Sequence, residues 1–163
     1  MNGPFPYPDE SFDVICANQV IEHLYGTDSF AKEIYRVCRR DGYVVISTPN
    51  LAGLHNIGSL ILGKQPFATT VSDERHLGNE FTPFWNVDLS HEKHFRRHVR
   101  VFAYDGLIQF LEYHRFKIEK LVTSGYYPFP EPISALLARI DKRHAAYLTV
   151  KARKRVGQTS WCK

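Results

Sequence analysis

The sequence contains only three cysteines and no long apolar run, and both absences exclude classes of protein. Cys16, Cys38 and Cys162 show no C-x-x-C or other metal-ligand spacing, and we expect Cys16 and Cys38 to be small core residues. The longest apolar run, residues 57–62, contains a glycine and is too short to cross a bilayer. No N-terminal run combines positive charge with an apolar stretch, so we expect no signal peptide and a soluble, cytoplasmic protein.

The composition is that of one globular domain. With 44% hydrophobic and 13% aromatic residues, the 163-residue chain can form a packed core and lacks the signature of disorder. The net charge of +4 arises mainly from positive residues at 93–100 and 151–155. We interpret these as a solvated face and a charged tail; the alternative, nucleic-acid binding, would show as salt-dependent affinity for oligonucleotides. We expect residues 156–163 to form a disordered tail.

A strand, a helix and a second strand are predicted within the first fifty residues. Residues 11–17 form a nearly continuous apolar run, which is typical of a strand buried on both faces of a parallel sheet. Residues 27–29 offer N-caps for a helix whose apolar positions recur at helical spacing as far as Cys38. The Asp-Gly pair at 41–42 breaks the chain before a second strand at 43–47. Together these elements form a βαβ unit, which requires a parallel sheet.

The rest of the chain combines predictable elements with a long irregular segment. A broad apolar stripe predicts a helix over Tyr104–Tyr113, and alternation predicts a half-exposed strand over 116–122. We expect a short helix to begin at Pro132 and the last strand to occupy 145–150. Residues 51–100 show no sustained period, and their aromatic residues favour a folded cover over a flexible linker.

Five segments match, in order, the pattern of one enzyme family. Residues 5–15 resemble the approach to the fourth strand of class I S-adenosylmethionine-dependent methyltransferases, and residues 18–24 resemble the turn after it. Residues 33–50 resemble the next helix, turn and fifth strand, while 98–102 and 107–116 resemble a later helix and the entry to the sixth strand. This resemblance implies an α/β fold with a partial Rossmann-like sheet, in the strand order 4-5-7-6 with the last strand antiparallel.

The resemblance covers only the C-terminal half of such a domain. We assign residues 1–155 to that half, with 51–102 as an irregular cover over the acceptor side. None of the ten glycines forms a G-x-G-x-x-G cluster, the type of loop that brings backbone N–H groups close to the family's cofactor, and the acidic residue that holds the ribose is also missing. We therefore expect the chain alone to bind S-adenosylmethionine weakly or not at all, the upstream half being removed, lost or supplied by another chain.

Two turns depart from the family pattern. Arg115 stands where the family usually has a glycine that ends a helix. A non-glycine residue in the left-handed conformation costs about 1–2 kcal/mol, so we expect this helix to end differently here. Arg40 and Asp41 replace the usual proline and glycine, although the Asp-Gly pair still forms a good turn.

The resemblance implies methyl transfer from S-adenosylmethionine to a small-molecule, glycan or lipid acceptor, as part of a complete methyltransferase. The alternative is a non-catalytic remnant that acts as a binding or dimerisation module. At the end of the predicted fourth strand, the resemblance places Ala17, Asn18 and Gln19 at the cofactor, with Asn18 against it. An ordinary strand-end turn is the other interpretation of these three residues.

Glu22 and His23 are the predicted catalytic residues. In some relatives, among them small-RNA 2′-O-methyltransferases and ubiquinone-type O-methyltransferases, this pair binds a divalent metal or lies beside the acceptor. The metal-binding relatives also use a glutamate three residues earlier, where this chain has Gln19, a weaker ligand for a hard cation. We therefore expect no metal, and we keep two interpretations of His23, a base or orienting role and a structural one.

Three further histidines, His91, His94 and His98, would share one face of a helix. They do not form the H-E-x-x-H zinc motif, because the second histidine comes one residue too early. We interpret them as part of a basic, mobile segment near the acceptor side rather than as a metal site.

The predicted first strand also has a consequence for assembly. Without the family's first three strands, residues 12–17 would form a sheet edge, whose unpaired N–H and C=O groups are a template for another chain. We therefore expect a homodimer, either joined across this edge or domain-swapped. An N-terminal segment folded back over the edge is the alternative.

Overall fold

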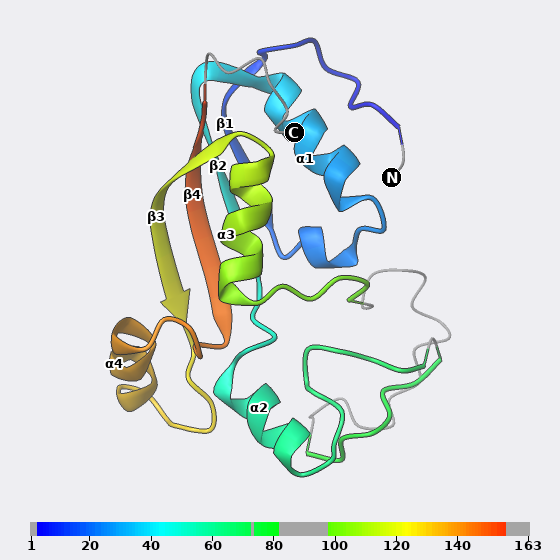
Figure 1. The fold of residues 1–163 in the computed structure, drawn as a ribbon, viewed down its shortest axis with the longest axis vertical. Helices are drawn as coiled ribbons and strands as arrows, with labels where there is room; N and C mark the ends of the chain where they lie inside the picture. The colour runs from blue at the N-terminus through cyan, green and yellow to red at the C-terminus, as the bar shows by residue number, and fades with distance from the viewer. Residues whose placement is uncertain (1–2, 73, 82–97, 156–163) are drawn as a thin grey trace.

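The computed structural model describes residues 3–72, 74–81 and 98–155 (Figure 1). Their centre is a sheet of four strands, β1 (Phe12–Asn18), β2 (Cys38–Pro49), β3 (Phe116–Ser124) and β4 (Tyr147–Lys154). The strands lie in the order β1-β2-β4-β3. Because β1 is parallel to β2 while β4 is antiparallel to both of its neighbours, the sheet is mixed.

The helices of the described residues are short. They are η1 (Ile21–His23), α1 (Thr27–Val37), α2 (Leu54–Ile61), α3 (Tyr104–Tyr113) and α4 (Ile133–Ile140). No helix in this part of the chain is long and apolar enough to span a membrane. The expected tail at 156–163 lies outside the described residues, as do His91 and His94.

The predicted strand, helix and strand are all present as β1, α1 and β2. β2 begins at Cys38, directly after α1, whereas the sequence predicted its start at residue 43. The Asp-Gly pair therefore lies inside the strand, at an irregularity where the pairing with β1 shifts. A Cβ at Gly42 would lie 2.8 Å from the backbone oxygen of Asp13, so the glycine allows the two strands to approach closely. The predicted chain break at this position is therefore wrong, because the strand continues through it.

One face of the sheet is packed by α1 and α3, which lie along it in Figure 1. Helical spacing turns the buried side chains of both helices onto this face, where they meet the inward side chains of β2 and β4. The largest buried side chains of this core include Ile34, Val44, Ile46, Leu107, Leu111, Phe116, Leu148 and Val150. Cys38 is fully buried, as predicted.

No described helix lies along the opposite face, which we call the open face (Figure 1). Val14 of β1 is 48% exposed and Cys16 is exposed, so the prediction that β1 is buried on both faces, with Cys16 in the core, is wrong for the described residues. The physical reason is that strand side chains alternate between faces. Ile15 and Ala17 point into the packed core, whereas Val14 and Cys16 point to the face that the described elements leave uncovered.

The later elements agree with the sequence in type and differ in length. α3 occupies the predicted residues, and α4 follows Pro132 as expected. β3 continues two residues beyond the prediction, whereas β4 begins two residues later than predicted and runs on to Lys154. α2 was not predicted, because it is one short helix within a stretch whose overall pattern is irregular.

Arg115 joins α3 to β3. Its φ of +64° places it in the left-handed region, and its N–H bonds to the carbonyl of Glu112 at 3.0 Å. The helix therefore ends with the backbone conformation that a glycine would adopt, and the expectation of a different ending is wrong.

Candidate active site at the end of β1

The carboxyl end of β1 leads into a tight turn that is anchored to β2. Gln19 has a φ of +53°, and its N–H bonds to the carbonyl of Ser47 at 3.1 Å. The Ser47 hydroxyl donates to Oδ1 of Asn18, while Nε2 of Gln19 lies 3.2 Å from that hydroxyl oxygen. Asn18 is exposed, whereas Ala17 is only 5% exposed and can offer a ligand little beyond its backbone.

η1 follows this turn and carries the predicted catalytic pair. The Glu22 side chain is completely buried, and neither of its carboxylate oxygens has a hydrogen-bond partner among the described residues. Nε2 of His23 lies 3.9 Å from Oε1 of Glu22, which is too long for a hydrogen bond. The structure therefore brings the two predicted residues together but leaves the carboxylate without the hydrogen bonds that burial normally requires.

His98 completes this group from a distant part of the chain. Its ring lies 5.0 Å from the ring of His23, and the ligand atoms of Glu22, His23 and His98 all lie within 4.8 Å of one another. We call these three residues the histidine–carboxylate cluster. The segment after His98 is held in place by backbone bonds, because the N–H groups of Val99 and Arg100 reach the carbonyl of Glu22 at 2.7 and 3.1 Å.

The protonation state of His98 follows from its surroundings. Nδ1 of His98 lies 2.8 Å from the carbonyl oxygen of Ala68, and because a carbonyl only accepts, this nitrogen carries the proton. Burial lowers the pKa of His98, an effect that the neighbouring His23 reinforces, whereas the Ala68 bond and Glu22 oppose it. The Ala68 bond therefore places a proton on Nδ1 and leaves Nε2 as the ring nitrogen that can face a ligand.

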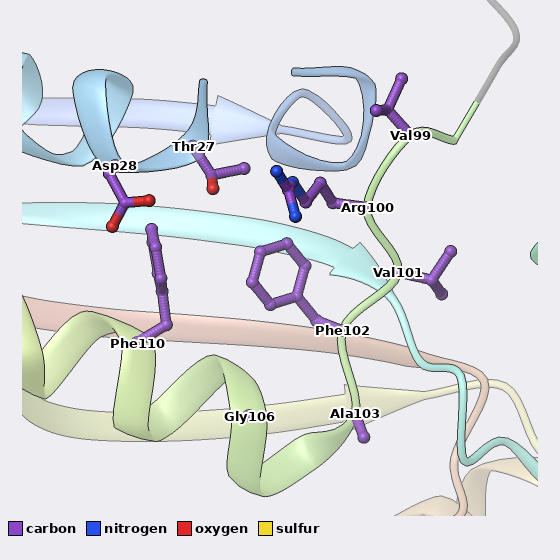
Figure 2. Close-up of a pocket in the computed structure, with 9 residues that line it drawn as sticks. All are labelled: Thr27, Asp28, Val99, Arg100, Val101, Phe102, Ala103, Gly106 and Phe110. Carbon is purple, nitrogen blue, oxygen red and sulfur yellow. The ribbon is translucent and has the colours of Figure 1, made fainter. Parts of the chain in front are cut away.

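An open pocket of about 580 Å³ adjoins the cluster (Figure 2). It is lined by Thr27, Asp28, Val99, Arg100, Val101, Phe102, Ala103, Gly106 and Phe110. In Figure 2 the Arg100 side chain reaches towards Thr27 at the start of α1, with the rings of Phe102 and Phe110 on the α3 side. The pocket thus combines two aromatic walls with one guanidinium and the carboxylate of Asp28, a lining suited to a small organic molecule.

The described residues fit S-adenosylmethionine only in part. Asn18 offers an exposed side chain at the carboxyl end of a parallel strand, which is where α/β sheets bind nucleotides. However, the crowded glycines of the described chain do not form an open cradle, because a Cβ added at Gly42, Gly53 or Gly78 would lie 2.8 Å from another protein atom. The described residues therefore offer features that suit only one side of such a cofactor, at Asn18.

Comparison with known proteins bears on the same region. A family model described as a methyltransferase domain matches residues 3–46, a segment that contains β1, η1, α1 and most of β2. A probable S-adenosylmethionine-dependent methyltransferase of Mycolicibacterium smegmatis is 49% identical over 45 residues, which are 28% of this chain and 18% of that protein. A probable methyltransferase of Mycobacterium tuberculosis shows the same identity over the same length, 16% of its own sequence.

Solved structures extend the likeness to most of the chain. A methyltransferase from Thermotoga maritima, described as a possible histamine N-methyltransferase, superposes with a TM-score of 0.58 at 16% identity, covering 93% of this chain and 60% of that one. A putative methyltransferase from Listeria monocytogenes gives 0.52 at 15% identity, covering 90% and 63%. The chain thus spans less than two thirds of these relatives.

The fold is therefore that of an α/β, Rossmann-like methyltransferase with a mixed four-stranded sheet in its described part. In sequence, the likeness to a methyltransferase domain covers residues 3–46, and the likeness to probable S-adenosylmethionine-dependent methyltransferases covers 45 residues, 28% of the chain.

Two parts of the site escaped prediction. The sequence grouped His98 with His91 and His94, which lie outside the described residues, and did not predict its contact with His23. The pocket was not predicted either, since Arg100 was interpreted as part of a solvated basic face and Thr27 and Asp28 as helix caps. No local pattern connects Arg100 or His98 to η1, because these residues are far apart in the sequence.

Proposed function

We propose that this chain forms the acceptor side of a methyltransferase domain that transfers a methyl group from S-adenosylmethionine to a small-molecule, glycan or lipid acceptor. The observation that carries the proposal is the methyltransferase-domain match over residues 3–46, because this segment includes the turn that bears Asn18, Gln19, Glu22 and His23. Under this proposal β1, β2, β3 and β4 correspond to the fourth, fifth, sixth and seventh strands of the family sheet.

Each site residue has a role in this proposal. Asn18 and the backbone of Ala17 and Gln19 border the adenosyl part of the cofactor, which supplies the methyl group. The acceptor occupies the pocket in front of Phe102, Phe110 and Arg100, close to η1. His23, which is 22% exposed, holds or removes the proton of an acceptor hydroxyl or amine, and Glu22 orients it. No observation specifically favours the alternative of a non-catalytic module.

The test completes the domain and measures cofactor binding by calorimetry. The part of the Mycolicibacterium relative that precedes its matched 45 residues is fused ahead of this chain, and S-adenosylhomocysteine is titrated. We expect weak or no binding by the chain alone and clear binding by the fusion. Asn18→Trp in the fusion should weaken binding at least about tenfold by filling the adenosyl side, an effect of about 1.4 kcal/mol or more.

Val122→Trp is the matched control, because Val122 is 48% exposed on β3, at the far side of the sheet from β1. It should leave the affinity unchanged. A fusion that folds but does not bind, or Asn18→Trp with unchanged affinity, would contradict the proposal.

We also propose that the chain forms a homodimer. β1 is an edge strand in the described sheet, and the apolar side chains of Val14 and Val20 are exposed near that edge. Light scattering on the purified chain tests it, and a monomer at high micromolar concentration would rule the dimer out.

A further inference from the structure

Glu22 is a buried acid whose surroundings do not account for its charge. Its side chain is fully buried in η1, and both carboxylate oxygens lack hydrogen-bond donors among the described residues. Buried carboxylates are normally paired, hydrogen-bonded or bound to a metal. The neighbouring groups are two imidazoles, and the nearer one, His23, stays 3.9 Å from Oε1. A direct ion pair at hydrogen-bonding distance is therefore not what stabilises this carboxylate.

His98 has the geometry of a metal-binding histidine. Metal-bound imidazoles usually donate their second ring N–H to a backbone carbonyl or a carboxylate, which fixes the tautomer and aims the other nitrogen at the ion. His98 makes this bond to the carbonyl of Ala68 at 2.8 Å. With Nδ1 held by this backbone bond, Nε2 is the ring nitrogen left for an ion, and the ring centroid lies 5.0 Å from that of His23.

We propose that Glu22, His23 and His98 bind a divalent transition-metal ion of the Zn²⁺ or Co²⁺ type. Their ligand atoms all lie within 4.8 Å of one another. Ligands about 2.1 Å from one tetrahedral ion are about 3.4 Å apart, so modest side-chain rotations close the site. Two imidazoles and one carboxylate are the donors that catalytic zinc sites use, with the fourth position open to water or substrate. Mg²⁺ and Ca²⁺, which prefer oxygen ligands, fit this set poorly.

This inference departs from the sequence-based expectation of no metal, and His98 is the reason. For the Glu22–His23 pair, the sequence suggested a ligand set that included position 19, where this chain has Gln19, and His98 was considered only in a separate site with His91 and His94. In the structure the side chain and the backbone N–H of Gln19 are hydrogen-bonded to Ser47, and His98 takes the place of the third ligand. Metal binding by these three residues can be tested without any cofactor. It would replace the base role proposed for His23, because a ring nitrogen that is bound to an ion cannot also accept a proton.

The ion would also connect two segments that are remote in sequence. Glu22 and His23 belong to η1, whereas His98 precedes the backbone bonds from Val99 and Arg100 to Glu22. An ion bound by both segments would hold the wall of the adjoining pocket in place. Binding should therefore raise the thermal unfolding temperature, because a ligand that binds only the folded state stabilises it.

The test uses the full 163-residue chain after removal of metals with a chelator. Co²⁺ alone is titrated, and the visible absorption of the bound ion reports the number and type of ligands. We expect one equivalent to bind with the intensity of a tetrahedral or five-coordinate site, Zn²⁺ to displace it, and Mg²⁺ at the same concentration to leave the spectrum unchanged. Absence of a spectrum, or a spectrum abolished equally by Mg²⁺, would overturn the proposal.

Two variants assign the site. His98→Gln should weaken Co²⁺ binding at least about tenfold, whereas His144→Gln, which changes a histidine paired with Asp141 elsewhere, should not. Glu22→Gln should weaken binding similarly while leaving the unfolding temperature of the metal-free chain unchanged or higher, because an amide is easier to bury than an unpaired carboxylate. Wild-type affinity in both His98→Gln and Glu22→Gln, or a less stable metal-free Glu22→Gln, would contradict the proposal; the second result would indicate an ion pair.

Discussion

The two faces of the sheet are made from the same four strands, yet they differ in almost every physical property. On the packed face, which α1 and α3 cover, Leu148 of β4 is 0% exposed, as are Leu107 and Leu111 of α3 itself. On the open face, Val14 and Val122 are each 48% exposed, and charged side chains occupy the β3 and β4 strands. The alternation of strand side chains therefore determines which residues share a face, whereas the burial of that face depends on the elements that cover it.

The largest loss of stability should come from truncating a side chain on the packed face. Leu148→Ala removes a completely buried side chain of β4, and we expect it to lower the free energy of unfolding by about 2–5 kcal/mol through lost burial and the remaining cavity. Val122→Ala on the open face of β3 is the matched control, with an expected change within about 0.5 kcal/mol. Urea unfolding of both variants measures the difference. Similar losses in the two variants would show that the open face is also packed in solution.

This comparison explains how far the sequence could predict the fold. The helix Tyr104–Tyr113 was predictable to the residue because its apolar stripe is local information. The apolar run of β1 predicted a strand correctly but not its exposure, because Val14 and Cys16 have the same apolar character whether or not something covers them. Coverage is a property of the tertiary structure, and no pattern within β1 records it.

The candidate site likewise contains residues that local sequence predicts and residues that only tertiary contacts bring together. Glu22 and His23 are adjacent in the sequence, so a local motif was sufficient to select them. His98 is remote from them in the sequence, and its contact with η1 has no periodic signature. The sequence was sufficient to select Gln19 as a site residue. It could not predict the positive φ of Gln19 or its bonds to Ser47, because both depend on the pairing of β1 with β2.

A smaller change in the free energy of unfolding should come from the turn between α3 and β3. Arg115 holds a φ of +64° at the end of α3, where a side chain beyond glycine is strained. Arg115→Gly should therefore raise the free energy of unfolding by about 1 kcal/mol, a gain reduced by the greater freedom of glycine in the unfolded chain.

Arg115→Ala separates backbone strain from the loss of the arginine side chain, because alanine keeps the Cβ that causes the strain. It should show no gain, and denaturant unfolding compares the two variants directly. Equal stability of the glycine and alanine variants would mean that the strain is absorbed elsewhere in the turn.

The smallest effect should come from the charged part of the open face. Hydrogen bonds and ion pairs from Arg153 and Lys151 hold the pKa of Glu119 below its usual value of 4.5. A lowered pKa means that the folded state favours the ionised carboxylate, so this contribution is complete above about pH 4.5 and is lost as the pH falls through the lower folded value. Because the group is solvent-accessible, the contribution is small, and high salt screens it further.

Glu119→Gln should therefore lower the unfolding temperature slightly at pH 7 in low salt, by less than the change caused by Arg115→Gly. The difference from the wild type should shrink as the pH falls below 4.5 and again when about 1 M NaCl is added at pH 7. Thermal unfolding followed by circular dichroism under these conditions measures it. A large loss that persists in high salt would mean that the charges of the open face are covered in solution, and the contrast between the two faces would then be smaller than the described structure indicates.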